Sequence, residues 1–306
     1  MQATLTQTIS FEGVGLHSGA PVRMDVHPAA ACFGIWFKRT DVTDADNMIR
    51  AIYTAVGAKP LCSEVTNAAG VGVSTVEHIM AALAGCGIHN ALIEVNGPEV
   101  PIMDGCSADF VRAIVETGAR KQAARLHAIE VLSPVIVEEN GAMAMLTPAG
   151  GLEIDFHIDF SDAAIGRQHM ALDMRNGTFV RELSDSRTFC RKADIDTMHA
   201  NGLALGGTYE NAVVIDGDDV LSPGGLRHKD EAVRHKMLDA LGDLALAGAP
   251  ILGRYTGVKA GHAMTNKLLR KMFANPSSYR FVPCTPEQAA RLPGVGVRKA
   301  DLALVA

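Results

Sequence analysis

The sequence predicts an α+β protein built from two domains. The chain has 306 residues, about twice the length of a typical domain. A hydrophobic share of 48% and a charged share of 20% are typical of a globular protein with a sizeable core. Short apolar runs bounded by turn residues alternate with segments of helical periodicity in both halves of the chain.

The first half contains four expected strands and two expected helices. Apolar runs of strand length predict strands at 4–11, 22–27, 34–38 and 91–96. Helical periodicity predicts helices at 75–85 and 108–117. The polar segment 120–125 follows the second helix, so we expect a domain boundary there, with domains at 1–125 and 126–306.

The second half opens with expected strands at 128–137, 142–146 and 152–160. An irregular stretch after residue 186 contains a short helical segment at 195–200. A turn at 223–225 precedes a long helix expected at 231–247, which Gly248 ends. A strand at 251–258 and a helix at 262–273 follow.

Charge and cysteine content exclude several classes of protein. The formal charge is -6, from 28 basic and 34 acidic residues, and no cluster of Lys or Arg favours nucleic acid or an anionic membrane as a partner. The sequence shows no transmembrane segment and no signal peptide at its start. The six scattered cysteines form no CxxC pair, which predicts reduced thiols in a cytoplasmic protein.

Four polar residues recur at every fourth position of the expected helix 231–247: Glu231, His235, Asp239 and Asp243. A solvated helix face is the usual meaning of such a stripe. Asp239 and Asp243 lie in an apolar run, however, and buried carboxylates need partners or a metal. The sequence supports both interpretations about equally.

If the stripe is functional, helix geometry assigns different roles to its members. His235 and Asp239 are one turn apart and can bind a single ion. Asp243 is about 12 Å along the helix axis from His235, so it is better placed to orient another catalytic group.

Two further positions have both a structural and a functional interpretation. Ser74 and Glu77 match a capping box at a helix start, yet Glu77 and His78 could also reach one site as a base and a metal ligand. His262 follows a glycine-bearing loop, where it is either a surface histidine or a proton donor.

Together these residues describe a zinc hydrolase. Two His and one Asp would hold the ion and leave a fourth position for water, whose pKa zinc lowers to about 7. A Glu would take the proton of that water, and a His would deliver one to the departing amine.

Six long, collinear segments carry a resemblance to a known family. They are TLTQTISFEGVGLHSG (4–19), STVEHIMAALAGCGIHNALIEVNGPEVPIMDG (74–105), SRTF (186–189), GLALGGTYENAVV (202–214), VRHKMLDALGDLALAG (233–248) and GHAMTNKLL (261–269). Through them, the chain closely resembles the zinc-dependent UDP-3-O-acyl-N-acetylglucosamine deacetylases of lipid A biosynthesis in Gram-negative bacteria.

The resemblance implies a metal centre and its catalytic groups. His78, His235 and Asp239 would bind one Zn²⁺ per chain, and Fe²⁺ is an alternative ion in the cell. Glu77 would be the general base. His262 would be the general acid with Asp243 as its electrostatic partner.

The resemblance also implies residues around the substrate, an acylated UDP-sugar. The Thr188 hydroxyl would help to hold the oxyanion. Lys236 and Lys259 would face the head group and its diphosphate. Further substrate contacts would come from His17, Leu61, Phe160, Phe189 and Met198.

The implied fold has two β-α-α-β sandwich domains of similar plan, each with an insert, and an active site in the cleft between them. The second insert, at about 190–214, would form an apolar passage for the acyl chain. Its candidate lining is Ile195, Met198, Leu203 and Leu205, for which ordinary local packing is the alternative that the sequence leaves open. Cys190, Arg191 and Lys192 depart from the expected pattern there, so the sequence does not define the acyl length.

The expected protein is a cytoplasmic monomer that hydrolyses the 2-acetamido group and releases acetate. Two alternatives remain from the residues. One is a zinc amidase that acts on a different acylated amine. The other is a nucleotide-sugar-binding protein without turnover.

Overall fold

The computed structural model describes residues 1–304, which form a mixed α+β fold. A five-stranded sheet occupies the first third of the chain. Its strands, in spatial order, are β2 (Ile9–Val14), β3 (Pro21–Pro28), β8 (Ala91–Val95), β4 (Ile35–Arg39) and β5 (Met48–Arg50). Only β4 and β8 run parallel; the other neighbours are antiparallel.

A seven-stranded sheet is built from the second half. Its strands are β10 (His127–Val131), β11 (Val135–Glu139), β12 (Ala142–Pro148), β13 (Leu152–Asp159), β14 (Arg167–Asp173), β18 (Ile251–Val258) and β19 (Tyr279–Pro283). The central strand β18 pairs with β12, β13 and β10. Along β13 every second side chain is buried, so one face of this strand belongs to the core and the other does not.

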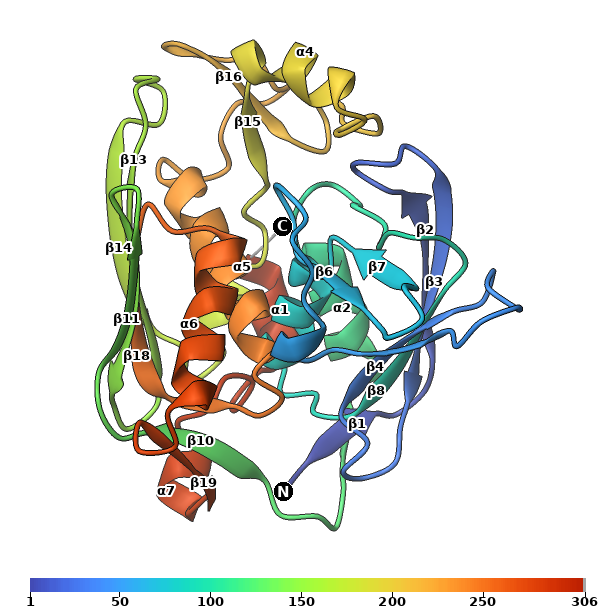
Figure 1. Cartoon of the computed structure of the whole chain (residues 1–306), viewed down its shortest axis with the longest axis vertical. Coiled ribbons are helices and arrows are strands. Elements are labelled where there is room, and N and C mark those ends of the chain that lie inside the picture. The colour runs from blue at the N-terminus through green and yellow to red at the C-terminus, as the bar shows by residue number, and fades with distance from the viewer. Residues whose placement is uncertain (305–306) are drawn as a thin grey trace.

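Four of the helices lie between the two sheets (Figure 1). They are α1 (Glu77–Gly85), α2 (Ala108–Thr117), α5 (Glu231–Ala245) and α6 (His262–Ala274). One hydrophobic core joins their apolar faces to the inner faces of both sheets. A Cβ added to Gly242 would lie 2.1 Å from the carbonyl oxygen of Glu77, so only glycine lets α5 approach the start of α1 this closely.

Smaller elements complete the fold. They are β1 (Ala3–Leu5), η1 (Tyr53–Ala55), β6 (Glu64–Thr66), β7 (Gly72–Ser74), β9 (Ala119–Lys121), α3 (Thr178–Glu182), β15 (Phe189–Arg191), α4 (Lys192–Ala200), β16 (Val213–Asp216), β17 (Asp219–Val220), α7 (Pro286–Ala289) and η2 (Lys299–Leu304). The segment from β15 to β16 projects beyond the start of α5, at the top of Figure 1. None of the described helices is long and apolar enough to cross a membrane.

Several expected elements differ in their bounds. The strand expected at 128–137 is two strands, because Pro134 lacks the N–H that a continuous ladder needs. The expected strand 4–11 is also divided: β1 pairs with β9, whereas β2 joins the five-stranded sheet. The helix expected at 195–200 begins at Lys192. No strand ladder within residues 1–304 links the segment 1–125 to the rest of the chain.

Candidate metal centre

The polar stripe on α5 is buried rather than solvated. The exposed fractions are 1% for Glu231, 2% for His235, 4% for Asp239 and 3% for Asp243. Interpreting the stripe as a solvated helix face is therefore wrong. Each of these side chains has a polar partner, and three of them meet residues at the start of α1 or α6.

His78, His235 and Asp239 converge where the start of α1 packs on α5. Their ligand atoms all lie within 4.8 Å of one another. Oδ1 of Asp239 is 3.4 Å from Nε2 of His235 and 3.7 Å from Nε2 of His78. Donor atoms around a tetrahedral zinc ion lie about 3.3–3.4 Å apart, so these separations fit one divalent ion.

The hydrogen bonds of this group also fit a cation. Oδ1 of Asp239 is buried and has no hydrogen-bond partner among the described residues. Such an orphaned carboxylate oxygen is costly unless a positive charge faces it. The residues present therefore match the donor chemistry of a zinc or iron(II) site.

His235 is held in the form that a metal ligand requires. Its Nδ1–H donates to the carbonyl oxygen of Ser186 at 3.0 Å, which leaves the Nε2 lone pair facing Asp239 and His78. Burial is the main cause that lowers the pKa of His235 to about 4, so the ring is neutral at physiological pH.

Glu77 is not part of a capping box. Helix α1 has Val76 as its N-cap without a side-chain hydrogen bond, and the Ser74 hydroxyl donates to the carbonyl of Pro98 instead. Oε2 of Glu77 accepts the backbone N–H of Ser63 at 3.0 Å. Burial raises the pKa of Glu77 above its usual value, and the neighbouring acids Asp239 and Asp243 add to this while nearby histidines oppose it.

His262 is not a surface histidine, because its side chain is only 14% exposed. Its Nδ1 lies 2.9 Å from Oδ2 of Asp243. Its Nε2 lies 3.8 Å from Oε1 of Glu77 and 3.9 Å from Oδ2 of Asp239. Burial alone lowers the pKa of His262, but the three surrounding carboxylates, Asp243 first, outweigh it and raise the pKa to about 10.

Ser63 contacts two of the predicted catalytic groups, a role that our sequence analysis did not assign to it. Its N–H donates to Glu77, and its hydroxyl donates to Oδ1 of Asp243 at 2.6 Å. One residue of the loop 61–63 thus orients two of the predicted catalytic groups. The sequence did not predict these contacts, because their partners Glu77 and Asp243 lie 14 and 180 residues away along the chain.

The two residues before Ser63 differ in burial: Leu61 is exposed and Cys62 is buried. Leu61 is 58% exposed and has a positive φ of 66°. The Cys62 thiol is buried, and burial with the nearby Glu77 carboxylate raises its pKa to about 12.

Lys236 lies beside the predicted ligands. Its Nζ donates to Oδ2 of Asp239 at 2.7 Å and lies 5.8 Å from the ring centroid of Phe189. The Phe189 ring packs edge-on against Phe160 and His235 at centroid distances of 5.4 Å and 6.3 Å. Lys236 and Phe189, two of the predicted substrate contacts, therefore lie beside each other and beside the metal cluster.

Thr188 and Phe189 are held by a buried ion pair one residue earlier. The Arg187 guanidinium contacts both carboxylate oxygens of Glu231, with Nε to Oε1 at 2.9 Å. The Thr188 N–H donates to the carbonyl of Gly105 at 2.8 Å. These contacts fix the 187–189 segment between the start of α5 and the loop that follows β8.

Lys259 is not among the contacts of the metal cluster. It begins the turn between β18 and α6 and pairs with Asp159, the residue before Phe160, at 2.9 Å. His17 is buried, and its Nδ1 accepts the backbone N–H of Ala204 at 3.3 Å. Thus His17 links the turn after β2 to the predicted insert.

The predicted insert contains α4, with Met198 half-buried, and Leu205 is 55% exposed. Its unexpected basic residues have acidic partners nearby. Arg191 pairs with Asp162 at 2.7 Å and Lys192 with Asp216 at 2.8 Å. These partners explain why positive charge is tolerated there.

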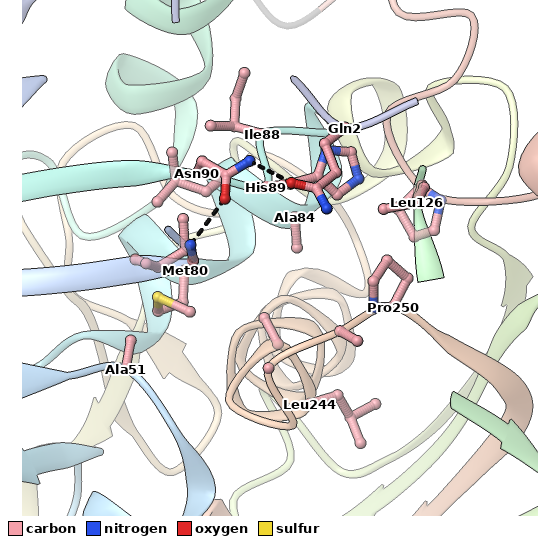
Figure 2. A pocket seen from close by; sticks show the side chains of 18 of the residues that line it. Gln2, Ala51, Met80, Ala84, Ile88, His89, Asn90, Leu126, Leu244 and Pro250 are labelled. Carbon is pink, nitrogen blue, oxygen red and sulfur yellow. Dashed lines mark hydrogen bonds between the residues drawn. The ribbon is translucent and has the colours of Figure 1, made fainter. Parts of the chain in front are cut away.

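A cavity of about 220 Å³ is lined by residues from the later turns of α1 and α5 (Figure 2). Its walls include Met80 and Ala84 of α1, Leu244 of α5, and a polar edge at Gln2 and Asn90. None of the predicted site residues lines it. It is therefore distinct from the metal cluster.

Comparison with known proteins places this geometry in a family. Residues 2–274 match the family model described as UDP-3-O-acyl N-acetylglycosamine deacetylase. The chain is 50% identical over 279 residues to the UDP-3-O-acyl-N-acetylglucosamine deacetylase of Phenylobacterium zucineum, covering 91% of this chain and 95% of the relative.

Relatives with lower identity come from other bacteria. The protein of the same name from Shewanella frigidimarina is 44% identical and covers 92% of each chain. That from Pasteurella multocida is 43% identical and covers 94% of this chain and 95% of its own. With one family model spanning nearly the whole sequence and relatives of matching length, the chain belongs to the UDP-3-O-acyl-N-acetylglucosamine deacetylase family.

Proposed function

We propose that this protein is a zinc-dependent deacetylase that removes the 2-N-acetyl group of UDP-3-O-(3-hydroxyacyl)-N-acetylglucosamine and releases acetate, an early committed step of lipid A biosynthesis. The names of its relatives support the substrate class. The observation that carries the proposal is the meeting of three metal donors with Glu77 and His262 at the α1–α5 junction.

His78, His235 and Asp239 would hold the metal, with Zn²⁺ as the proposed ion and Fe²⁺ as an alternative. When bound, a divalent ion in such a site polarises the amide carbonyl and acidifies a water molecule. The hydrogen bond from His235 to Ser186 keeps one ligand oriented before the ion arrives.

The proton steps fall to two groups beside the cluster, Glu77 and His262, whose Oε1 and Nε2 atoms lie 3.8 Å apart. Glu77 is the general base: its Oε1 is free of the Ser63 contact and takes a proton from water as the water oxygen attacks the acetyl carbon. His262 is the general acid: its Nε2–H is given to the nitrogen of the breaking C–N bond, so the amine leaves neutral and the other product is acetate.

The remaining predicted residues would position the substrate. Thr188 would donate its hydroxyl to the developing oxyanion, and Lys236 and Lys259 would bind the head group and its phosphates. Phe160, Phe189, His17 and Leu61 would line the sugar-nucleotide and acyl ends, and Met198 with its neighbours in 190–214 would contact the acyl chain. We also propose that 1–125 and 126–306 are the two domains, with the active site between them.

We propose a cytoplasmic, monomeric protein. All six cysteines are free thiols, including the exposed Cys32, as expected where disulfides do not persist.

The decisive experiment separates chemistry from metal binding. Glu77→Gln should keep the metal content of the wild type and lose at least ~100-fold in kcat, because the amide cannot accept a proton. Metal content is measured by elemental analysis and turnover by acetate release. A Glu77→Gln enzyme with near-normal turnover would refute the base assignment, and His78→Ala should lose the metal itself.

The substrate class needs a second assay. Acylated and unacylated UDP-N-acetylglucosamine are compared with the same enzyme preparation. Strong preference for the acylated compound is expected. Equal turnover would contradict an acyl passage in 190–214 and favour a different acylated amine as substrate. If the metal-bound protein binds the acylated UDP-sugar without releasing acetate, the result would favour a nucleotide-sugar-binding protein without turnover.

A further inference from the structure

A second group of metal-binding side chains lies on the hairpin of β13 and β14. Asp155 and His157 belong to β13, and His169 lies directly opposite His157 on β14. Side chains alternate along β13, so these residues share the face that points away from the buried positions Phe156 and Ile158. Helix α5, which carries His235 and Asp239, packs against β13 and β14 (Figure 1).

The three donor atoms are close enough to share one ion. Oδ1 of Asp155 lies 3.1 Å from Nε2 of His157 and 2.9 Å from Nε2 of His169. All three ligand atoms lie within 4.8 Å of one another. With metal–ligand bonds of about 2.0–2.1 Å, tetrahedral donor atoms are about 3.3–3.4 Å apart, so two of the separations need only a few tenths of an ångström of expansion.

The surroundings orient the carboxylate for this role. Arg254 on β18 donates to Oδ2 of Asp155, which directs Oδ1 toward the two rings. Metal-ligating carboxylates commonly have such a second hydrogen bond. Glu153 lies 3.8 Å from the same guanidinium, so its charge offsets that of Arg254 near the site.

The two imidazoles are stacked 4.0 Å apart with only 8° between their planes. Their side chains are 42% and 53% exposed, so each ring has room to tilt its Nε2 lone pair toward an ion. Strand pairing already fixes their Cα positions, so little backbone conformational entropy is lost when an ion binds.

We propose that Asp155, His157 and His169 form a second site for one divalent transition-metal ion, separate from the catalytic centre, with water in the remaining position. Two imidazoles and a carboxylate favour Zn²⁺, Ni²⁺ or Cu²⁺ over Mg²⁺ or Ca²⁺. An ion there cross-links β13 to β14 and stabilises the hairpin that ends next to Phe160. This inference does not depend on the proposed reaction.

The test uses the holoenzyme with its catalytic metal retained and Ni²⁺ as the probe. The wild type should bind one additional equivalent in calorimetry, and its Tm should rise with Ni²⁺ concentration. His157→Gln and His169→Gln should each weaken that binding at least about tenfold, keep the wild-type Tm without Ni²⁺, and keep wild-type kcat. His127→Gln, an exposed histidine on β10, should behave as the wild type.

Two results would overturn the proposal. One is a wild-type holoenzyme that binds no additional equivalent. The other is equal Ni²⁺ binding by the wild type and both glutamine variants. Zinc retained in the protein is measured throughout, so that exchange at the catalytic site is not counted as binding. Loss of the second equivalent with unchanged acetate release separates this site from the proposed function.

Discussion

Nδ1 of His262 lies 2.9 Å from Oδ2 of Asp243, a contact that joins the start of α6 to the last turn of α5. The other oxygen of Asp243 accepts the Ser63 hydroxyl at 2.6 Å. Ser63, in the loop before α1, therefore orients the Asp243 carboxylate, and that carboxylate in turn orients His262. Its position on α5 lets it orient His262 without sharing the metal with His235.

Asp243→Asn should lower the pKa of His262, because the carboxylate is the largest of the influences that raise it. A weaker base loses its proton at lower pH, so the alkaline limb of the kcat/KM profile should move to lower pH. We expect kcat to fall at least about tenfold, since His262, the proposed general acid, also loses the carboxylate that orients it. The profile is measured by acetate release across the pH range.

The control for this variant is Asp44→Asn, an exposed acid outside the metal centre. It should leave the profile unchanged. If Asp243→Asn lowers kcat but leaves the alkaline limb where it was, His262 is not the group that titrates there.

Gly242→Ala should separate α1 from α5. A Cβ at this position meets the Glu77 carbonyl oxygen at 2.1 Å, and the obstacle is backbone that cannot rotate away. We expect a loss of about 1–3 kcal/mol in unfolding free energy, measured with urea, together with weaker metal retention because His78 shifts with Glu77. In Gly97→Ala the new Cβ has only a 3.8 Å contact, so stability comparable to the wild type is expected.

Glu231→Gln should destabilise the protein more than an ordinary charge removal. It leaves the nearly buried Arg187 guanidinium without its anionic partner, at a cost of about 3–5 kcal/mol. Because Arg187 precedes Thr188, turnover should fall even at temperatures where the variant is folded. Asp230→Asn breaks a more exposed ion pair with Arg234 and should cost at most about 1 kcal/mol. Equal effects of the two changes in urea unfolding would contradict the structural role of Glu231.

His89 makes stability depend on pH in the acid range. Burial lowers its pKa to about 4, and the nearby amino terminus adds to the shift. Between the unfolded value of about 6.5 and pH 4 the unfolded chain binds more protons, so this contribution is complete above about pH 6.5 and lost as the pH falls toward 4. The loss attributable to this residue should be about 3 kcal/mol.

The measurement compares urea unfolding of the wild type and His89→Gln at neutral and acid pH. Glutamine retains an acceptor for the Ala3 N–H that His89 now binds, so folding is preserved. The variant should lose less stability on acidification than the wild type. An identical pH dependence in both proteins would show that His89 does not titrate as described.

Local patterns were sufficient for most of the helices and strands near the site. The expected helix 108–117 and strand 251–258 have the bounds that the structure shows, because apolar periodicity acts within one element. The sequence analysis did not predict strand β14. Exposed residues alternate along it with residues that are only partly buried, so its apolar pattern is weak. The predicted capping box does not form, because the Ser74 hydroxyl donates to the carbonyl oxygen of Pro98 on another segment.

By itself, the sequence determined the family, the mixed α+β composition and the one-turn spacing of His235 and Asp239, since each of these depends on residue order alone. Only the tertiary structure decided that the α5 stripe is buried, that His78 joins it from α1, and that Ser63 holds two acids in place. The physical reason is distance along the chain: His78 and His235 meet through helix packing, which depends on a glycine-sized gap at Gly242 and on a core shared by both sheets.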